Sequence, residues 1–232
     1  MTTATPLTGT RSHRGTAHWR SYSRLVTGNL LNLHAYERAS ARALARRFGY
    51  GIEDCMALEV GCGFCGHLIT LQRFGVPPQN LHGVDLREEP IVSARARFPM
   101  LQLTVGDARR LPYPDAHFDI ITQNVCFTSI LSEETRREVA QEMMRTLKPG
   151  GVILWYDFRY DNPRNQSVRS VNGAQLRSYF PGMKARVKPI LLFPWLARYM
   201  GSSAWTPLYH LCYALRPLRT HLFAELSWKG RS

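Results

Sequence analysis

Three glycines in one short segment are the first sign of chemistry in this sequence. Gly61, Gly63 and Gly66 form a GxGxxG pattern that follows an apolar run and precedes a helical pattern. Glycines at this spacing allow a tight turn and let a ligand lie against bare backbone at the start of a helix. Asp85 ends the next apolar run, and its carboxylate suits the two hydroxyls of a ribose. The pattern predicts a ligand that contains a nucleoside.

Acidic residues near the glycines distinguish two such ligands. A nicotinamide dinucleotide brings an anionic pyrophosphate to this turn, where Glu59 would repel it. S-adenosylmethionine has no phosphate, and its sulfonium and ammonium groups suit an acidic neighbour. A second acid, Asp107, follows the third apolar run, where it can reach an adenine amino group. The acids therefore favour S-adenosylmethionine over NAD.

A parallel sheet is needed to bring these residues together. From residue 55 onward, short apolar runs alternate with helical segments, which is typical of βαβ units. Strands are expected at 55–60, 81–86, 101–105, 118–123, 152–156, 185–193 and 221–228. Helices are expected at about 29–47, 67–74, 90–98, 132–147 and 206–215.

One domain is expected, because the chain has no internal repeat and no linker that would divide it. Residues 1–17 are polar and lack an apolar core, which predicts a disordered leader and not a secretory signal. Residues 18–232 then form the domain. Its expected parts are an N-terminal helical lid at about 18–50, a cofactor-binding core at about 51–157 and an acceptor-shaping part at about 158–232.

Four segments resemble motifs of the class I S-adenosylmethionine-dependent methyltransferases, in that family's order and spacing. They are ALEVGCGFCG, GVDL, GDARRLPYPDAHFDII and LKPGGVIL, and the resemblance runs from about Cys55 to the C-terminus. The sequence is most similar to bacterial small-molecule enzymes related to the ubiquinone-biosynthesis methyltransferases. The resemblance implies an α/β, Rossmann-like fold with helices on both faces of a seven-stranded, mostly parallel sheet. It also implies the strand order 3-2-1-4-5-7-6, with the last strand antiparallel.

The same resemblance implies a set of cofactor-binding residues. They are Glu59, Gly61, Cys62, Gly63, Asp85, Leu86, Asp107, Ala108 and Asn124. The methionine part of S-adenosylmethionine would be bordered by Glu59, Gly61, Cys62 and Gly63. The ribose would be held, and the adenine flanked, by Asp85 and Leu86. The adenine edge would be contacted by Asp107 and Ala108, and the backbone of Asn124 would lie near the amino-acid part.

Cys62 and Cys65 form a C-x-x-C pair, a pattern that elsewhere binds zinc or acts in redox chemistry. Both lie inside the glycine turn, and no second pair of cysteines or histidines supplies further ligands. We therefore expect no metal. The five cysteines are thinly spread, which predicts a reduced protein in the cytoplasm and no disulfide scaffold.

The reaction requires chiefly that the nucleophile and the sulfonium be aligned, because methyl transfer is an in-line displacement at an activated methyl group. A base is needed only for a hydroxyl or a protonated amine. The candidates for a base or substrate anchor are Asp157, His18 and Tyr22. The candidates for acceptor binding are Phe127, Arg159, Tyr160 and Arg164, because acceptors approach over the carboxyl ends of the strands.

Charge is distributed unevenly along the chain. The net charge of +13 comes from basic ends, +7 over residues 1–50 and +10 over residues 158–232, around a centre of −4. This distribution suits a phosphate- or carboxylate-bearing partner, a membrane surface or a nucleic acid. A nucleic-acid methyltransferase is disfavoured, because Asn124-Val-Cys-Phe does not match the Asn/Asp-Pro-Pro-aromatic tetrad of the amino-methylating enzymes.

The sequence therefore predicts methyl transfer to oxygen, nitrogen or carbon of a small molecule in bacterial biosynthesis. The acceptor is expected to be aromatic or to carry an anionic group, and the enzyme to be a monomer or homodimer. The main alternative is a lipid-linked or membrane-surface acceptor, reached through peripheral membrane contact. An RNA methyltransferase and a catalytically silent binding module are the remaining alternatives.

Overall fold

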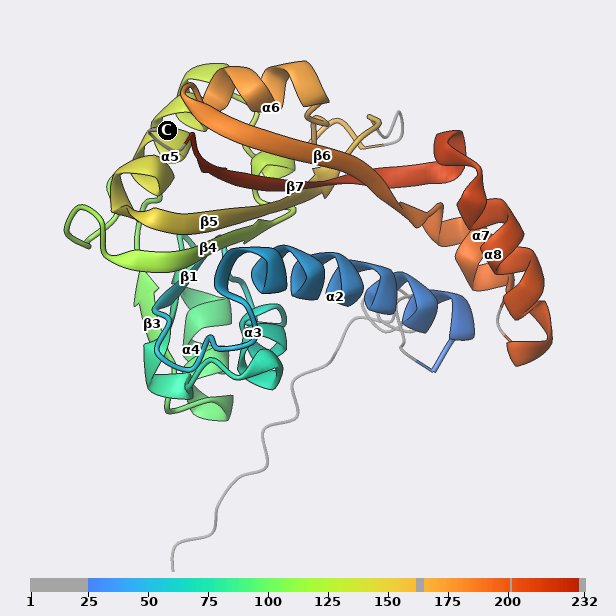
Figure 1. Ribbon diagram of the computed structural model, residues 1–232, viewed down its shortest axis with the longest axis horizontal. Helices are drawn as coiled ribbons and strands as arrows, with labels where there is room; N and C mark the ends of the chain where they lie inside the picture. The colour runs from blue at the N-terminus through green and yellow to red at the C-terminus, as the bar shows by residue number, and fades with distance from the viewer. Residues whose placement is uncertain (1–24, 162–164, 201, 230–232) are drawn as a thin grey trace, which may run out of the picture.

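A seven-stranded sheet forms the centre of the structure, a computed structural model that describes residues 25–161, 165–200 and 202–229 (Figure 1). Its strands are β1 (Ala57–Val60), β2 (Leu81–Asp85), β3 (Gln102–Val105), β4 (Phe118–Asn124), β5 (Leu147–Phe158), β6 (Met183–Leu192) and β7 (Arg219–Trp228). The strand order is β3-β2-β1-β4-β5-β7-β6. β1 to β5 pair in parallel, and β7 is antiparallel to both β5 and β6. The predicted order and the antiparallel last strand are confirmed.

Helices cover both faces of the sheet. They are α2 (Thr27–Phe48), α3 (Leu68–Phe74), α4 (Glu88–Arg97), α5 (Glu133–Thr146), α6 (Gly173–Tyr179), α7 (Pro194–Tyr199) and α8 (Thr206–Ala214), with short 3-10 turns η1 (Pro78–Asn80), η2 (Phe127–Ser129), η3 (Ser203–Trp205) and η4 (Arg216–Leu218). Side chains of α2, α3 and α4 share one core cluster, and those of α5 and α6 share another. β5 supplies both clusters, because successive side chains of a strand point to opposite faces: Leu154 joins the first and Trp155 the second.

Several element boundaries differ from the sequence prediction. β5 begins at Leu147 and not at 152, because Leu147 already pairs with Phe118 across a local irregularity in the ladder. The start of α5 agrees with the predicted helix at 132–147, since the Ser132 hydroxyl caps the helix by accepting a hydrogen bond from the Thr135 amide. α6 was not predicted, although Asn172 and Gln175 form a capping box at its start. The six-residue helix α7 was not predicted either.

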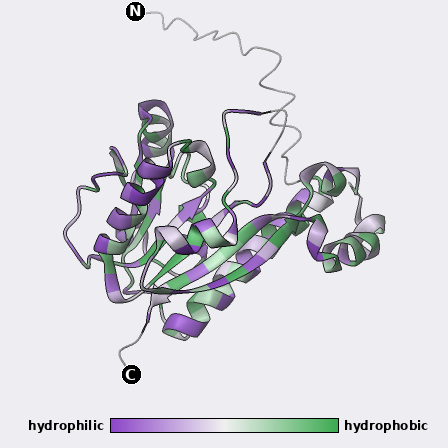
Figure 2. Cartoon of the chain, turned by 90° about the horizontal axis from the view of Figure 1, so that it is seen from above, coloured by the Kyte–Doolittle hydropathy of each residue, from purple (hydrophilic) through white to green (hydrophobic). Residues whose placement is uncertain are grey.

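Two helices project from the sheet between β6 and β7. We call the described residues of 193–218, which contain α7 and α8, the helical lobe; it lies apart from the body of the protein in both views (Figures 1 and 2). The N-terminal half of α2 packs against it. The buried Asn32 side chain donates to the Leu192 carbonyl and accepts from the Leu192 amide and the Tyr209 hydroxyl. Within the described residues, no helix has the length and apolar character needed to cross a membrane.

Candidate cofactor site

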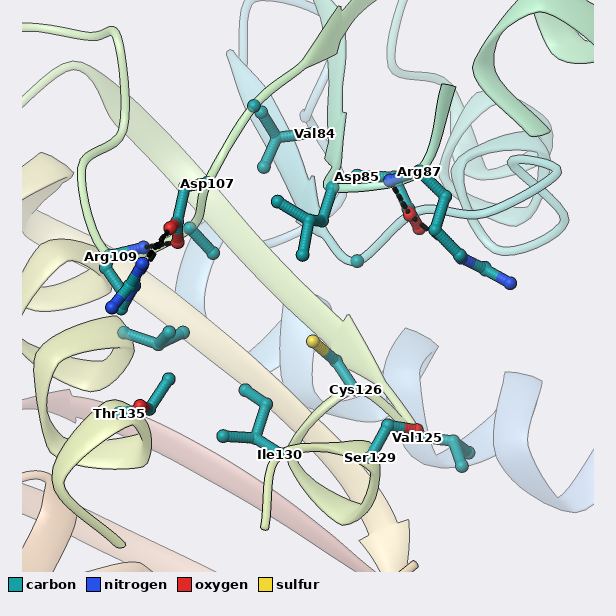
Figure 3. Close-up of a pocket in the computed structure, with 15 residues that line it drawn as sticks. Val84, Asp85, Arg87, Asp107, Arg109, Val125, Cys126, Ser129, Ile130 and Thr135 are labelled. Atoms are coloured by element: carbon teal, nitrogen blue, oxygen red, sulfur yellow. Dashed lines mark hydrogen bonds and ion pairs between the residues drawn. The ribbon is translucent and has the colours of Figure 1, made fainter. Parts of the chain in front are cut away.

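A cavity of about 520 Å³ opens at the carboxyl edge of the sheet, where β1, β2, β3 and β4 end (Figure 3). The start of α5 closes one side of it. The residues that line it are Gly61, Val84, Asp85, Leu86, Arg87, Gly106, Asp107, Ala108, Arg109, Val125, Cys126, Ser129, Ile130, Thr135 and Val139. Loops that are distant in the sequence meet here because parallel strands bring their carboxyl ends to the same edge.

The glycine turn forms the inner wall of this cavity. The amides of Gly61 and Cys62 both donate to the Val84 carbonyl, at 2.8 and 3.0 Å, so the turn is held against the end of β2. Gly61 and Gly63 have φ values of +70° and +49°, which side chains disfavour. A Cβ on Gly61 would also lie 2.6 Å from the Cys126 sulfur. The turn therefore requires glycine both for its backbone angles and for its close approach to the loop after β4.

Asp85 lies at the mouth of the turn. One carboxylate oxygen accepts from the Gly63 amide at 2.8 Å, and the other accepts from the amide and the Nε of Arg87, at 3.0 and 3.2 Å. A carboxylate offers about four acceptor positions, so one is left for a ligand hydroxyl. The surroundings of Asp85 thus fix the orientation of its carboxylate toward the cavity and still leave one acceptor position for a ligand.

Asp107 is placed in the same way beyond β3. Its carboxylate accepts from the backbone amide of Arg109 at 2.9 Å and from the Arg109 guanidinium at 2.8 and 2.6 Å. These hydrogen bonds lower the pKa of Asp107 below its usual range, so the group is ionised at neutral pH. Two acids, each braced by an arginine two residues later, therefore face the cavity from adjacent strands (Figure 3).

Comparison with known proteins identifies this arrangement. A family model described as a methyltransferase domain matches residues 57–151. A fatty-acid O-methyltransferase of Mycolicibacterium smegmatis is 31% identical over 193 residues, which cover 74% of this chain and 66% of that protein. The chain belongs to the class I S-adenosylmethionine-dependent methyltransferases.

Two further proteins place this methyltransferase among its relatives. A phthiotriol/phenolphthiotriol dimycocerosates methyltransferase of Mycobacterium tuberculosis is 33% identical over 138 residues, 52% of this chain and 48% of that protein. The solved structure of a geranyl diphosphate C-methyltransferase from Streptomyces coelicolor shares the fold, with a TM-score of 0.61, 17% identity and coverage of 86% and 83%. The chain spans about half to two thirds of the length of these two curated relatives.

The residues of the methyltransferase site fit S-adenosylmethionine in two respects. The Asn124 side-chain oxygen is buried and has no hydrogen-bond partner among the described residues, so an acceptor is left over next to Glu59, although Asn124 itself does not line the cavity. A Cβ added to Gly63 would lie 3.7 Å from Arg87 and 4.0 Å from Asp85, in the space that a ribose on Asp85 would need. Both features suit a ligand with an ammonium group and a nucleoside.

Glu59 and Cys62 lie deeper than the resemblance implied, because neither lines the cavity. Glu59 is buried, and its carboxylate accepts from the Leu68 amide at 3.1 Å and from the Asn124 side chain at 2.9 Å. Burial raises the pKa of Glu59 to about 8. Glu59 therefore braces the start of α3 and orients Asn124, whose side chain and not only its backbone is engaged. Cys62 packs beneath the turn, against Gly83.

Asp157 does not lie in the cavity, and its position argues against a role as base. The side chain is buried, and its two oxygens accept from the backbone amides of Thr128 and Phe158, at 3.0 and 2.8 Å. Burial raises the pKa of Asp157 to about 7. The carboxylate holds the η2 turn through the Thr128 amide, so its position does not support the predicted role as a base or substrate anchor.

The other predicted acceptor-side residues do not converge on this cavity. Phe127 is fully buried in the core, while Arg159 and Tyr160 line a separate hollow of about 460 Å³ between β6, β7 and the start of α6. The Arg159 guanidinium donates to the Arg216 carbonyl there. His18, Tyr22 and Arg164 lie outside the described residues. Their proposed roles stay predictions.

The loop after β4 supplies lining residues that are not among the predicted site residues. Val125, Cys126, Ser129 and Ile130 line the cavity, and the buried Gln123 side chain accepts from the Cys126 amide. No motif marks these residues; only their place after a central parallel strand could have suggested them. Among the described residues, the cysteines are free and no cluster of three or more histidines, cysteines or acids is arranged for a metal. The absence of a metal stays a prediction.

Proposed function

We propose that this methyltransferase transfers the methyl group of S-adenosylmethionine to a small molecule that has an apolar body and a carboxylate. The observation that carries the proposal is the pair of braced acids, Asp85 and Asp107, beside the glycine turn. The turn would approach the methionine part, Asp85 would accept from the ribose, and Asp107 with Ala108 would meet the adenine edge. When bound, the cofactor supplies an electrophilic methyl group.

A carboxylate acceptor matches the lack of a base in the cavity. Asp85 and Asp107 are the only carboxylates among its described lining residues, and both are engaged by arginines. An alcohol or a protonated amine would need a base to release its proton. A carboxylic acid is already ionised at neutral pH, since its pKa lies near 4, and can attack without one. The protein would then act by alignment and by excluding water.

The names of two relatives support an apolar body. One is named for fatty acids and the other for phthiotriol dimycocerosates. The basic C-terminal third, with +10 over residues 158–232, would in addition favour an anionic head group. The alternative of RNA gains no support from these relatives.

A transfer assay tests the acceptor class. The purified full chain, given S-adenosylmethionine with a labelled methyl group and palmitic acid, is expected to form labelled ester that partitions into organic solvent. Hexadecanol, which has the same chain but no ionised oxygen, is expected to be a much poorer acceptor. Asp85→Ala serves as the control for transfer that depends on the site. Transfer to hexadecanol in preference to palmitic acid, or to added RNA alone, would contradict the proposed acceptor.

A further inference from the structure

The second helix of the helical lobe turns apolar side chains outward. Leu208 and Leu211 lie three residues apart and share one side of α8, and Leu215 follows directly after the end of the helix. They are 38%, 65% and 56% exposed, whereas Tyr209, on another side of the helix, is buried against the lobe core. In a surface helix of a soluble protein the apolar stripe normally faces the core. Here an additional apolar stripe faces solvent.

Exposed aromatic side chains lie in the same lobe. Trp195 and Tyr199 lie one turn apart on α7, with 53% and 80% of their surface exposed, and Trp205 at the start of α8 is 51% exposed. We call these three aromatics and the three leucines the apolar lobe surface. Single exposed apolar residues are normal, but six of the sixteen large apolar side chains exposed among the described residues lie in this lobe. Such a concentration favours an interaction surface.

Charge identifies the kind of partner. The sequence has no Asp or Glu between Asp161 and Glu225, a stretch that holds nine Lys and Arg residues. Arg198 and Arg216 belong to the lobe itself. Tryptophan, tyrosine and leucine next to arginine are the composition of segments that lie in the interface of an anionic bilayer. A second copy of this chain packed lobe against lobe would instead bring arginine against arginine, without an acid to offset the repulsion.

The topology places the lobe at the edge of the sheet at which the cofactor cavity opens. β6 runs in the same direction as β5, because both are antiparallel to β7. β6 therefore ends at the same edge of the sheet at which the cofactor cavity opens, and the lobe begins there (Figure 1). We propose that the apolar lobe surface docks the protein on an anionic phospholipid bilayer. This inference goes beyond the proposed function and does not depend on it.

Vesicle sedimentation tests the docking. The full chain is expected to sediment with vesicles of phosphatidylcholine and phosphatidylglycerol, and much less with phosphatidylcholine alone. Raising the salt concentration should release part of it, because the charge contribution is screened. The double variant Tyr199→Glu, Leu211→Glu is expected to bind at least about tenfold more weakly, since two apolar side chains become charged.

A matched double variant controls for the added charge. Tyr50 and Met100 are 98% and 59% exposed and precede β1 and β3, so they lie at the opposite, amino edge of the sheet. Tyr50→Glu with Met100→Glu should bind vesicles like the wild-type chain. The proposal is overturned if the wild-type chain stays in the supernatant, if both double variants lose binding equally, or if the lobe variant instead abolishes a dimer seen by light scattering. Calorimetry with S-adenosylhomocysteine reports separately on the proposed function.

Discussion

Gly63→Val is expected to abolish binding of S-adenosylhomocysteine while the sheet stays folded. The residue has a φ of +49°, a conformation in which a β-branched side chain is strongly disfavoured. Its side chain would also point toward Arg87 and Asp85, into the space proposed for the ribose. Strain of this kind costs about 1–3 kcal/mol, which a domain of this size can tolerate, whereas a filled ligand site cannot bind. Circular dichroism and calorimetry together provide the measurement.

Gly66→Ala is the control for the glycine turn. A Cβ there would meet nothing within 4 Å, and no left-handed φ is required. This variant should keep wild-type affinity for S-adenosylhomocysteine. If folded Gly63→Val binds as well as Gly66→Ala, the glycine turn is not part of the cofactor site.

Arg136→Met is expected to lower the free energy of unfolding by about 3–5 kcal/mol, because it removes a buried charge from its hydrogen-bond partners. The Arg136 side chain is fully buried within α5. Its guanidinium donates to the backbone carbonyls of Ile130 and Arg169, each at 2.7 Å, and to that of Phe127 at 3.1 Å. Methionine fills similar space but leaves these carbonyls without their donor.

The consequence should reach the cofactor cavity, since the loop that Arg136 holds includes Ile130, one of the lining residues. Affinity for S-adenosylhomocysteine is therefore expected to fall together with stability. Arg137→Met is the matched control, because Arg137 is the next residue of the same helix and is exposed. Urea unfolding of the two variants gives the comparison. Equal stabilities would show that the buried guanidinium contributes nothing to the fold.

Periodicity and motif spacing were sufficient to predict the sheet and the residues of the site that directly follow its strands. The glycine turn, Asp85 and Asp107 lie where the sequence placed them, because each follows directly from the end of a strand in a parallel sheet. Strand boundaries were less accurate where pairing overrides local pattern, as at Leu147 in β5. Short helices such as α7 carry too few residues for a periodic signal.

Side-chain partners across the sheet could not be predicted. Glu59 and Asn124 lie 65 residues apart in the chain, and their hydrogen bond exists only because β1 and β4 are neighbours. Asp157 was correctly noticed as a polar residue after an apolar run, but nothing in the sequence shows that it faces the Thr128 amide. Its burial, and with it the change from base to positioning residue, depends on the packing of several elements at once.

The central claim is that the cavity binds S-adenosylmethionine, and calorimetric titration of the wild-type chain tests it most directly. S-adenosylhomocysteine is expected to bind at one site, while NAD, whose pyrophosphate would meet the Asp85 carboxylate at the mouth of the glycine turn, is not. Asp85→Ala should weaken the binding of S-adenosylhomocysteine by about 10- to 100-fold, the effect of losing a buried hydrogen-bond acceptor. Tighter binding of NAD than of S-adenosylhomocysteine would contradict the account.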